Sequence, residues 1–308
     1  MIELHNRSTK LVLARPDVAT PYYRGTRFDR SGIILSLESR GRKYVSQWFR
    51  EYDPFNHDGV GGPAEEFSPI GYDNADPGGG FLKPGVGLLE RDVDEYDHFR
   101  LYKVLDEGER DFKAAPGQAE FRHRMAAGGY SYDYMKRIII PREGTLVLEH
   151  ILKNTGKGIM DMYVYNHNFF VLDGAPTGKA TVITLPFKPQ GHWREEYDSV
   201  ALTDNGIRFA RDLRPGETIF MGDLKGSEQR KNYSFRLTNT ANGLTVDARS
   251  DAAMEYAVFW CNHEVACLEP YTHLLIEPGR QAEWKISVPC DKRVPRCKRR
   301  ILPKKTFS

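Results

Sequence analysis

The chain has 308 residues, of which 40% are hydrophobic and 28% charged, a composition typical of a soluble globular protein. Its 44 lysines and arginines nearly balance its 42 aspartates and glutamates, so no strong overall field favours nucleic acid or a membrane surface as a partner. No apolar run has the length of a membrane span, and the first residues lack the apolar core of a signal peptide.

Runs of β-favouring residues with alternating apolar positions follow one another along the chain, separated by turn signals such as Asn205-Gly and Glu277-Pro-Gly. No segment keeps a helical apolar stripe over several turns. The sequence therefore predicts an all-β fold, with two large sheets packed face to face in one domain over residues 1–308. The predicted strands are 33–37, 43–49, 99–105, 119–125, 130–140, 145–153, 160–172, 181–185, 218–220, 233–238, 244–248, 257–261, 265–271 and 281–288.

Residues 53–84 interrupt this rhythm, because they are rich in proline and glycine and show little alternation. A loop of this length inside a compact domain is either functional or disordered. Its aromatic and acidic residues, among them Phe55, Glu66 and Tyr72, argue against disorder. The sequence therefore predicts an ordered loop that contributes to a site.

The four cysteines lie in the last fifth of the chain and show no Cys-x-x-Cys spacing, so no zinc site is predicted. We expect reduced thiols in a cytoplasmic protein, with a bridge between Cys290 and Cys297 as the alternative. The basic C-terminal tail, residues 291–308, is interpreted as a solvated end, and contact with an anionic partner is the other interpretation. The adjacent pairs His57–Asp58 and His263–Glu264 also lack metal-ligand spacing.

Asn166, His167 and Asn168 place three polar side chains inside an aromatic strand, where unpartnered polar groups cost free energy. Alternation puts Tyr165, His167 and Phe169 on one strand face and the two asparagines on the other. A histidine in this position is either a satisfied structural residue or a proton donor near neutral pH. The strand by itself leaves both interpretations open.

A second unusual strand places Cys267, Glu269 and Tyr271 on one face. A carboxylate in such apolar surroundings costs free energy unless it is paired or hydrogen-bonded. Pro270 lacks a ladder donor and therefore predicts a strand end or an edge strand at this point. Glu269 is either the partner of a nearby arginine or a general base at a strand end.

Together these two segments resemble the galactose mutarotase (aldose 1-epimerase) superfamily. Tyr165-Asn-His-Asn-Phe-Phe170 is similar to the family's Asn-His-x-Tyr-Phe element, in which the histidine is the acid. Ala266-Cys-Leu-Glu-Pro270, with an apolar strand after a following Pro-Gly turn, is similar to the family's Cys-x-Glu-Pro strand, in which the glutamate is the base. The order of the two residues also agrees. The resemblance covers about residues 120–290 and implies a large twisted β-sandwich.

The N-terminal half departs from the family. Its Gly-Arg-x-x-Asn-Arg and Leu-His-Gly-Gly elements have no clear counterpart, and Gly62-Pro-Ala-Glu-Glu-Phe67 and the segment Phe81 to Arg91 stand in their place. This indicates a divergent branch and leaves the sugar unidentified. Each candidate for a supporting sugar contact also has an ordinary explanation as a loop, surface or core residue; these candidates are Glu66, Lys83, Arg91, His98 and Trp193.

The resemblance implies an enzyme that interconverts the anomers of a monosaccharide or small carbohydrate by opening and closing its ring. Glu269 would be the base and His167 the acid, with the roles reversed on closure. Because two proton transfers suffice, the resemblance implies no metal and no other cofactor. Two alternatives remain: a non-catalytic carbohydrate-binding protein, and a carbohydrate lyase or hydrolase on the same scaffold. The oligomeric state is not predicted.

Overall fold

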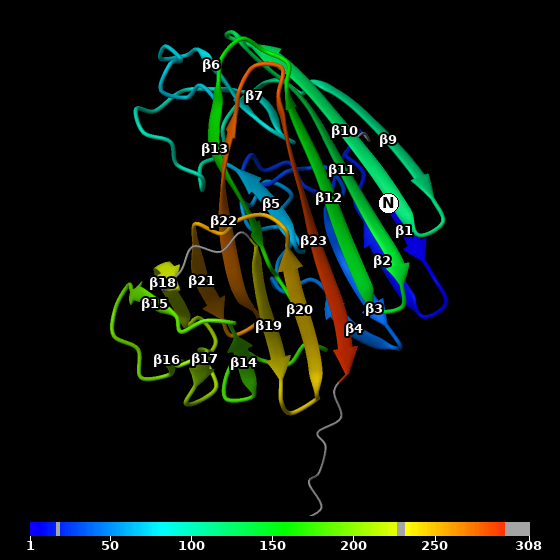
Figure 1. Ribbon diagram of the computed structural model, residues 1–308, viewed down its shortest axis with the longest axis vertical. Helices are drawn as coiled ribbons and strands as arrows, with labels where there is room; N and C mark the ends of the chain where they lie inside the picture. The colour runs from blue at the N-terminus through cyan, green and yellow to red at the C-terminus, as the bar shows by residue number, and fades with distance from the viewer. Residues whose placement is uncertain (17–18, 227–231, 293–308) are drawn as a thin grey trace, which may run out of the picture.

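The computed structural model describes residues 1–16, 19–226 and 232–292. These residues form strands, turns and loops without an α-helix, which confirms the predicted all-β fold (Figure 1). Accordingly, the described part of the chain contains no helix long and apolar enough to cross a membrane. Most of the basic tail and Cys297 lie outside the described residues, and so does the predicted alternative of a bridge from Cys290 to Cys297.

Two large antiparallel sheets form most of the structure (Figure 1). The first has ten strands in the order β16 (Val200–Thr203), β17 (Gly206–Phe209), β14 (Thr181–Thr184), β19 (Tyr233–Asn239), β20 (Leu244–Ser250), β23 (Gln281–Lys292), β12 (Thr145–Asn154), β11 (Tyr130–Arg142), β10 (Gln118–Ala127) and β9 (Glu109–Ala115). The second has six strands in the order β15 (Gln190–Trp193), β18 (Thr218–Lys225), β21 (Tyr256–Asn262), β22 (Ala266–Ile276), β13 (Met160–His167) and β5 (Ala64–Phe67).

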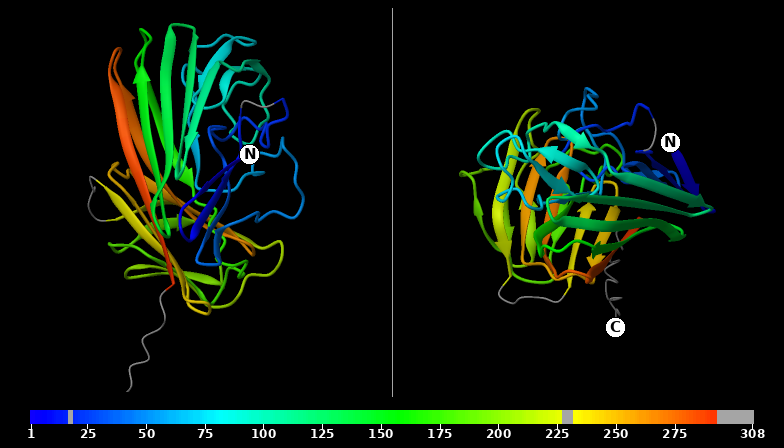
Figure 2. Two further views of the ribbon diagram at one scale, coloured as in Figure 1. Left: turned by 90° about the vertical axis from the view of Figure 1, so that its right-hand side faces the viewer. Right: turned by 90° about the horizontal axis from the view of Figure 1, so that it is seen from above.

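Two smaller sheets come from the N-terminal third of the chain. One has four strands, β1 (Ile2–His5), β2 (Thr9–Leu13), β3 (Ile34–Ser39) and β4 (Arg42–Val45), and the other has three, β6 (Gly80–Lys83), β7 (Gly87–Glu90) and β8 (Val104–Asp106). In the side view, the blue N-terminal strands and the cyan segment lie on one side of the molecule and the red strand β23 on the other (Figure 2, left).

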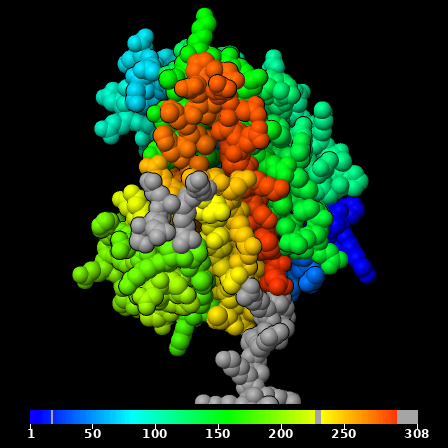
Figure 3. All heavy atoms as spheres, viewed as in Figure 1, coloured from blue at the N-terminus to red at the C-terminus, as the bar shows by residue number. Residues whose placement is uncertain are grey.

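A shared apolar core joins the sheets. One cluster of buried side chains includes Leu37 of β3, Phe121 of β10, Leu148 of β12, Val164 of β13 and Phe259 of β21. Alternation supplies these side chains, because every second residue of a strand points to the same face. On the opposite face, β23 is exposed along its length in the space-filling view (Figure 3), and its outward residues alternate with buried ones. At β23 the ten-stranded sheet therefore has one buried and one solvated face.

Three predicted strands are shorter by several residues in the structure than their apolar runs. β4 ends at Val45, β13 ends at His167, and only residues from Val104 onward of the run 99–105 pair in a sheet. The apolar residues beyond two of these ends pack against each other, since the rings of Trp48 and Phe169 stack with centroids 4.9 Å apart. The apolar content of these runs predicted that the residues beyond the strand ends would pack in the interior. It did not predict that they lie outside the hydrogen-bonded sheets.

The segment 53–84 is not a loop throughout, because it contains β5 and β6. All four residues of β5 are buried, so the strand shows no alternation, and its centre is Glu65-Glu66. The prediction of a strand end at Pro270 is also wrong. β22 continues to Ile276, and Pro270 lies opposite Ala257 of β21, while pairing with β13 extends only as far as Tyr271.

Candidate active site

His167 and Glu269 meet on the outer face of the six-stranded sheet. β13 and β22 are antiparallel neighbours in which Tyr165 lies opposite Tyr271. Continuing this register by two residues brings His167, the last residue of β13, next to Glu269. The Nε2 atom of His167 and the Oε1 atom of Glu269 are 3.1 Å apart. The structure therefore brings together the two residues that the sequence proposed as acid and base.

The two side chains line a pocket of about 230 Å³. Its wall combines charged groups from N-terminal loops with aromatic and apolar groups from β18, β21 and β22. The lining residues are Arg27, Asp58, His98, Phe99, His167, Arg194, Phe220, Val258, Trp260, Glu269 and Tyr271. A small apolar pocket with a few convergent polar groups is the usual form of a site for a small ligand.

The side chains of His167 and Glu269 are each 4% exposed. Each has one polar atom that makes no hydrogen bond within the described chain and could therefore bind a ligand. Among the described residues, the buried His167 Nδ1 makes no hydrogen bond, and the 3.1 Å approach of Glu269 Oε1 to His167 Nε2 lacks hydrogen-bond geometry, so this buried oxygen is unsatisfied as well. His167 is held by ring packing instead, since Phe169 stacks on it with centroids 3.8 Å apart and Trp260 meets it edge-on at 5.6 Å. Buried polar atoms without partners are rare in folded proteins, and they are often explained by function.

Burial shifts the pKa values of the pair toward their neutral forms. The pKa of Glu269 is raised well above its usual value, mainly because burial disfavours the carboxylate, while Arg27 acts in the opposite direction. The pKa of His167 is lowered well below its usual value by burial and by the charges of Arg27 and His98. Both shifts favour a pair that holds a single proton and no net charge.

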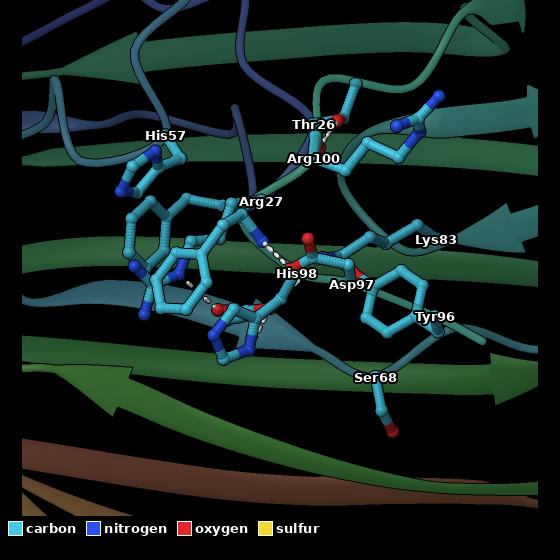
Figure 4. A network of polar contacts seen from close by, with 12 residues as sticks. Thr26, Arg27, His57, Ser68, Lys83, Tyr96, Asp97, His98 and Arg100 are labelled. Carbon is cyan, nitrogen blue, oxygen red and sulfur yellow. Dashed lines mark hydrogen bonds and ion pairs between the residues drawn. The ribbon is translucent and has the colours of Figure 1, made fainter. Parts of the chain in front are cut away.

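Arg27 is a buried positive charge of the pocket, held in place by three hydrogen bonds (Figure 4). Its Nε donates to Glu66 Oε2 at 2.7 Å, its Nη1 donates to Asp58 Oδ1 at 2.5 Å, and its Nη2 donates to the Tyr165 hydroxyl at 2.9 Å. The side chain is only 5% exposed, so these three bonds hold the guanidinium in one geometry. The close-up shows Arg27 between His57 and His98 (Figure 4).

Glu66 and Lys83, two of the predicted sugar contacts, lie behind Arg27 and do not line the pocket. Lys83 Nζ donates to Glu66 Oε1 at 3.2 Å and to the Tyr96 hydroxyl, and its side chain is fully buried (Figure 4). Burial alone would raise the pKa of Glu66, but Lys83 and Arg27 outweigh it and lower the pKa to about 2. The two residues therefore position Arg27 rather than reach a ligand.

His98 lines the pocket, as its candidate role requires. It lies on the loop between β7 and β8, with its side chain 37% exposed and its Nδ1 4.0 Å from Glu66 Oε1. Burial lowers its pKa, and Glu66 opposes that shift.

Arg91 and Trp193 are not brought to the pocket. Arg91 donates to the backbone carbonyl oxygens of Tyr72, Ala75 and Asp94, so it ties a loop together. The Trp193 ring packs edge-on against Phe259, with centroids 6.4 Å apart, as a side chain of the core boundary. The structure supports the ordinary explanation for these two candidates.

The opposite face of β13 carries a buried ionic network. The Asn166 amide donates to Glu65 Oε1 at 3.0 Å, and His150 Nε2 lies 3.0 Å from the same oxygen. Lys136 Nζ donates to Glu65 Oε2, and Asp29 lies 3.7 Å from that ammonium group. Glu65 and Glu66 thus point to the two faces of one strand. Asn166 belongs to the network on the face opposite His167, the face on which alternation placed it.

Sequence reasoning missed most of the remaining pocket residues. Tyr271 carried a signal, since it shares a strand face with Glu269 two residues away. Asp58 belongs to the segment 53–84, which the sequence predicted to contribute to a site, although the residue itself was not singled out for it. Arg27 and Arg194 come from other parts of the chain, and no local pattern marks them. Among the described residues, no group of three or more histidine, cysteine, aspartate or glutamate side chains is arranged to hold a metal ion.

No family model and no curated protein matches the sequence. Solved structures match the fold. A galactose mutarotase related enzyme from Lactobacillus acidophilus is 11% identical with a TM-score of 0.58, covering 94% of this chain and 97% of that one. A galactose mutarotase-like protein from Clostridium acetobutylicum is 11% identical with a TM-score of 0.58, over 94% and 95%. An aldose epimerase homologue from C. elegans is 12% identical with a TM-score of 0.51, over 94% and 98%.

These similarities extend over nearly the whole length of each protein, while the sequences have diverged to about one identical residue in nine. They confirm the architecture that the two sequence segments implied. The chain has the galactose mutarotase-like β-sandwich fold, in a form far removed in sequence from these solved structures.

Proposed function

We propose that the chain is an aldose 1-epimerase-like enzyme that interconverts the anomers of a sugar, with Glu269 and His167 as its acid–base pair. The observation that carries the proposal is the 3.1 Å approach of His167 Nε2 to Glu269 Oε1 inside a pocket of about 230 Å³. The fold of galactose mutarotase-like proteins supports it.

Ring opening needs two coupled proton transfers. Glu269 removes the proton of the anomeric hydroxyl, the C1–O5 bond breaks as C1 becomes a carbonyl, and His167 delivers a proton to the ring oxygen. Rotation about C1–C2 and the reverse transfers close the ring on the other face. The pair begins as imidazolium and carboxylate and ends as imidazole and carboxylic acid, so one shared proton serves both ends of the step. Burial favours the second arrangement, and Arg27 lowers the pKa of Glu269 and so favours its carboxylate.

Asp58, the other carboxylate of the pocket, already has partners within the protein. Asp58 accepts from Arg27 and lies 3.2 Å from His57 Nε2. Glycoside hydrolysis usually requires two carboxyl groups that are both available to the substrate. This arrangement favours the single carboxylate–histidine pair, and hence epimerisation, over hydrolysis.

Exchange NMR of the anomeric protons, on a panel of aldoses, tests the proposal. The wild type should accelerate anomer exchange of at least one sugar, and Glu269→Gln should slow it by about 10²–10⁴-fold. Glu283→Gln, an exposed residue on β23, is the matched control and should behave as wild type. Sugar binding without acceleration would instead favour a carbohydrate-binding protein, and cleavage of an oligosaccharide would favour a lyase or hydrolase.

A further inference from the structure

The segment that carries Arg27 connects the two large sheets. Arg27 bonds to the six-stranded sheet, because its guanidinium donates to Glu66 of β5 and to Tyr165 of β13. Asp29, two residues later, bonds to the ten-stranded sheet, since its Oδ2 atom accepts from the Tyr134 hydroxyl of β11 at 3.0 Å. The side chains of Arg27 and Asp29 are both buried.

The chain bends between these two residues, at positions 26–28. Residues i and i+2 of a regular strand point to the same side, but the side chains of Arg27 and Asp29 lead to different sheets. Within the described chain, neither Arg27 nor Phe28 makes a backbone–backbone hydrogen bond. The first such bond after the bend joins the Asp29 amide to the carbonyl oxygen of Glu65 at 2.8 Å. Asp29 is therefore the point at which the backbone of the bend is attached to the sheets.

The carboxyl group of Asp29 is enclosed on several sides. Its Oδ1 atom accepts from the backbone amide of Ser31 at 2.8 Å, and its Oδ2 atom lies 3.7 Å from Lys136 Nζ of β11. A Cβ added to Gly85 would lie only 2.0 Å from its Oδ1 atom, so the packing around it is tight. A side chain locked by packing and by hydrogen bonds to both oxygens fixes the backbone that carries it.

Hydrogen bonds, rather than charge, explain the role of Asp29 best. Lys136 contacts both Asp29 and Glu65 and donates a hydrogen bond to Glu65. Burial alone would raise the pKa of Glu65, but Lys136 and His150 outweigh it and lower the pKa to about 2. Burial raises the pKa of Asp29, with Lys136 opposing the shift and Glu65 adding to it. Lys136 is therefore mainly the counter-ion of Glu65.

We propose that Asp29 is a positioning residue, which ties the bent segment to the ten-stranded sheet and so holds the Arg27 guanidinium in the pocket wall. Its catalytic consequence rests on the proposed function. Glu66, Asp58 and Tyr165 bind the guanidinium, which is the far end of a long side chain. Asp29 instead fixes the backbone from which that side chain extends.

Displacement of Arg27 would change the acid–base pair. Burial raises the pKa of Glu269, and the charge of Arg27 opposes that shift. Burial lowers the pKa of His167, and the charge of Arg27 lowers it further. Both pKa values rise if the guanidinium moves away, so both limbs of the pH profile of kcat/KM for anomer exchange should move to higher pH. A loss of stability alone would leave the limbs in place.

Two substitutions of Asp29 test the inference. Asp29→Ala removes both acceptors and should move both limbs upward by about 0.5–1 pH unit, whereas Asp29→Asn retains shape and polar contacts and should match the wild type. NMR of arginine Nε–H groups follows Arg27 directly, because its Nε–H donates to buried Glu66 and should resist exchange with solvent. Asp29→Ala should speed this exchange by about tenfold or more, and Asp29→Asn should not. Arg27→Lys assigns the signal, since it lacks the group.

Asn239→Ala is the stability control. Asn239 is also buried, and its Oδ1 atom accepts from the backbone amides of Ala241 and Asn242 at the end of β19. The variant should lower the melting temperature and leave the Arg27 exchange rate and the limbs unchanged. Equal loss of protection in Asn239→Ala would overturn the inference. Protection that is retained in folded Asp29→Ala, or lost equally in Asp29→Asn, would overturn it too.

Two further outcomes are distinguished by the NMR measurement, which does not depend on turnover. If Asp29→Ala does not fold, Tyr134→Phe removes one hydrogen bond to Asp29 and keeps the ring. Faster Arg27 exchange in that variant would support the inference, and an unchanged rate would overturn it. If no sugar is turned over, the proposed function fails, while exchange that is faster in Asp29→Ala alone still supports the positioning of Arg27.

Discussion

Tyr165 and Tyr271 lie directly opposite each other on β13 and β22, with their rings stacked 4.2 Å apart between centroids. This cross-strand pair fixes the register of the two strands at the point where the site begins. A slip of one residue would turn His167 or Glu269 to the other face of the sheet. The hydroxyl of Tyr165 also donates a hydrogen bond to Glu66, the carboxylate that accepts from Arg27. Tyr165 therefore connects β13 to the residues that hold Arg27 in place.

Glu269→Gln should stabilise the protein at pH 7 while it slows anomer exchange. The raised pKa of Glu269 means that the folded state holds its proton above pH 4.5, where the unfolded chain releases it, so the contribution of this residue to stability falls as pH rises. Glutamine is neutral at every pH and avoids this cost. The melting temperature of the variant should exceed that of the wild type at pH 7, and the difference should vanish below about pH 4. A variant that melts lower at pH 7 would contradict this account.

The pH dependence of kcat/KM for anomer exchange should be bell-shaped. A second proton on the pair removes the acceptor, and loss of the only proton removes the donor. Because burial lowers the pKa of His167, the acidic limb should lie below 6.5, the usual histidine value. The alkaline limb should lie above 4.5, the usual glutamate value, because burial raises the pKa of Glu269. An acidic limb centred above pH 7 would contradict the assignment of that limb to His167.

Glu66→Gln should destabilise the fold by about 3–5 kcal/mol at neutral pH, because it leaves Arg27 and Lys83 buried without their shared carboxylate. The lowered pKa of Glu66 means that its stabilisation is present above pH 4.5 and is lost as pH falls toward about 2. The free energies of unfolding of variant and wild type, measured by denaturant titration, should therefore converge in that pH range. Glu143→Gln breaks the surface pair with Arg40 and should cost only about 0–1 kcal/mol.

Alternation and turn residues were enough to predict the all-β fold, because strands such as β10 and β11 have one buried and one solvated face. The strand patterns marked His167 and Glu269 as unusual but left structural interpretations open, and the pair was predicted only through the resemblance to the galactose mutarotase superfamily. The strand β5 was not predicted, because a strand buried on both faces has no alternation; Glu66 was instead predicted as a candidate sugar contact in a loop. Arg27 was missed for a different reason, because its placement depends on contacts between loops that are distant in the chain. For its partner Asp58, the sequence predicted the site-forming segment but not the residue.

Gly62→Ala should impair catalysis without touching the acid–base pair. Gly62 precedes β5 and packs against the end of β13, where an added Cβ would lie 2.7 Å from the carbonyl oxygen of His167 and 2.9 Å from the amide nitrogen of Phe169. Both are backbone atoms, so the end of β13 must shift and carry the His167 ring with it.

A displacement of about 1 Å at a catalytic group can cost about 10²-fold in rate, so kcat for anomer exchange should fall by that order. Gly222→Ala is the matched control, because its Cβ would meet nothing closer than 3.6 Å, and its activity should match the wild type. A chemical-shift change at the His167 ring in Gly62→Ala, together with a near-normal melting temperature, would identify displacement as the cause. Full activity in Gly62→Ala would show that the position of His167 does not depend on this contact.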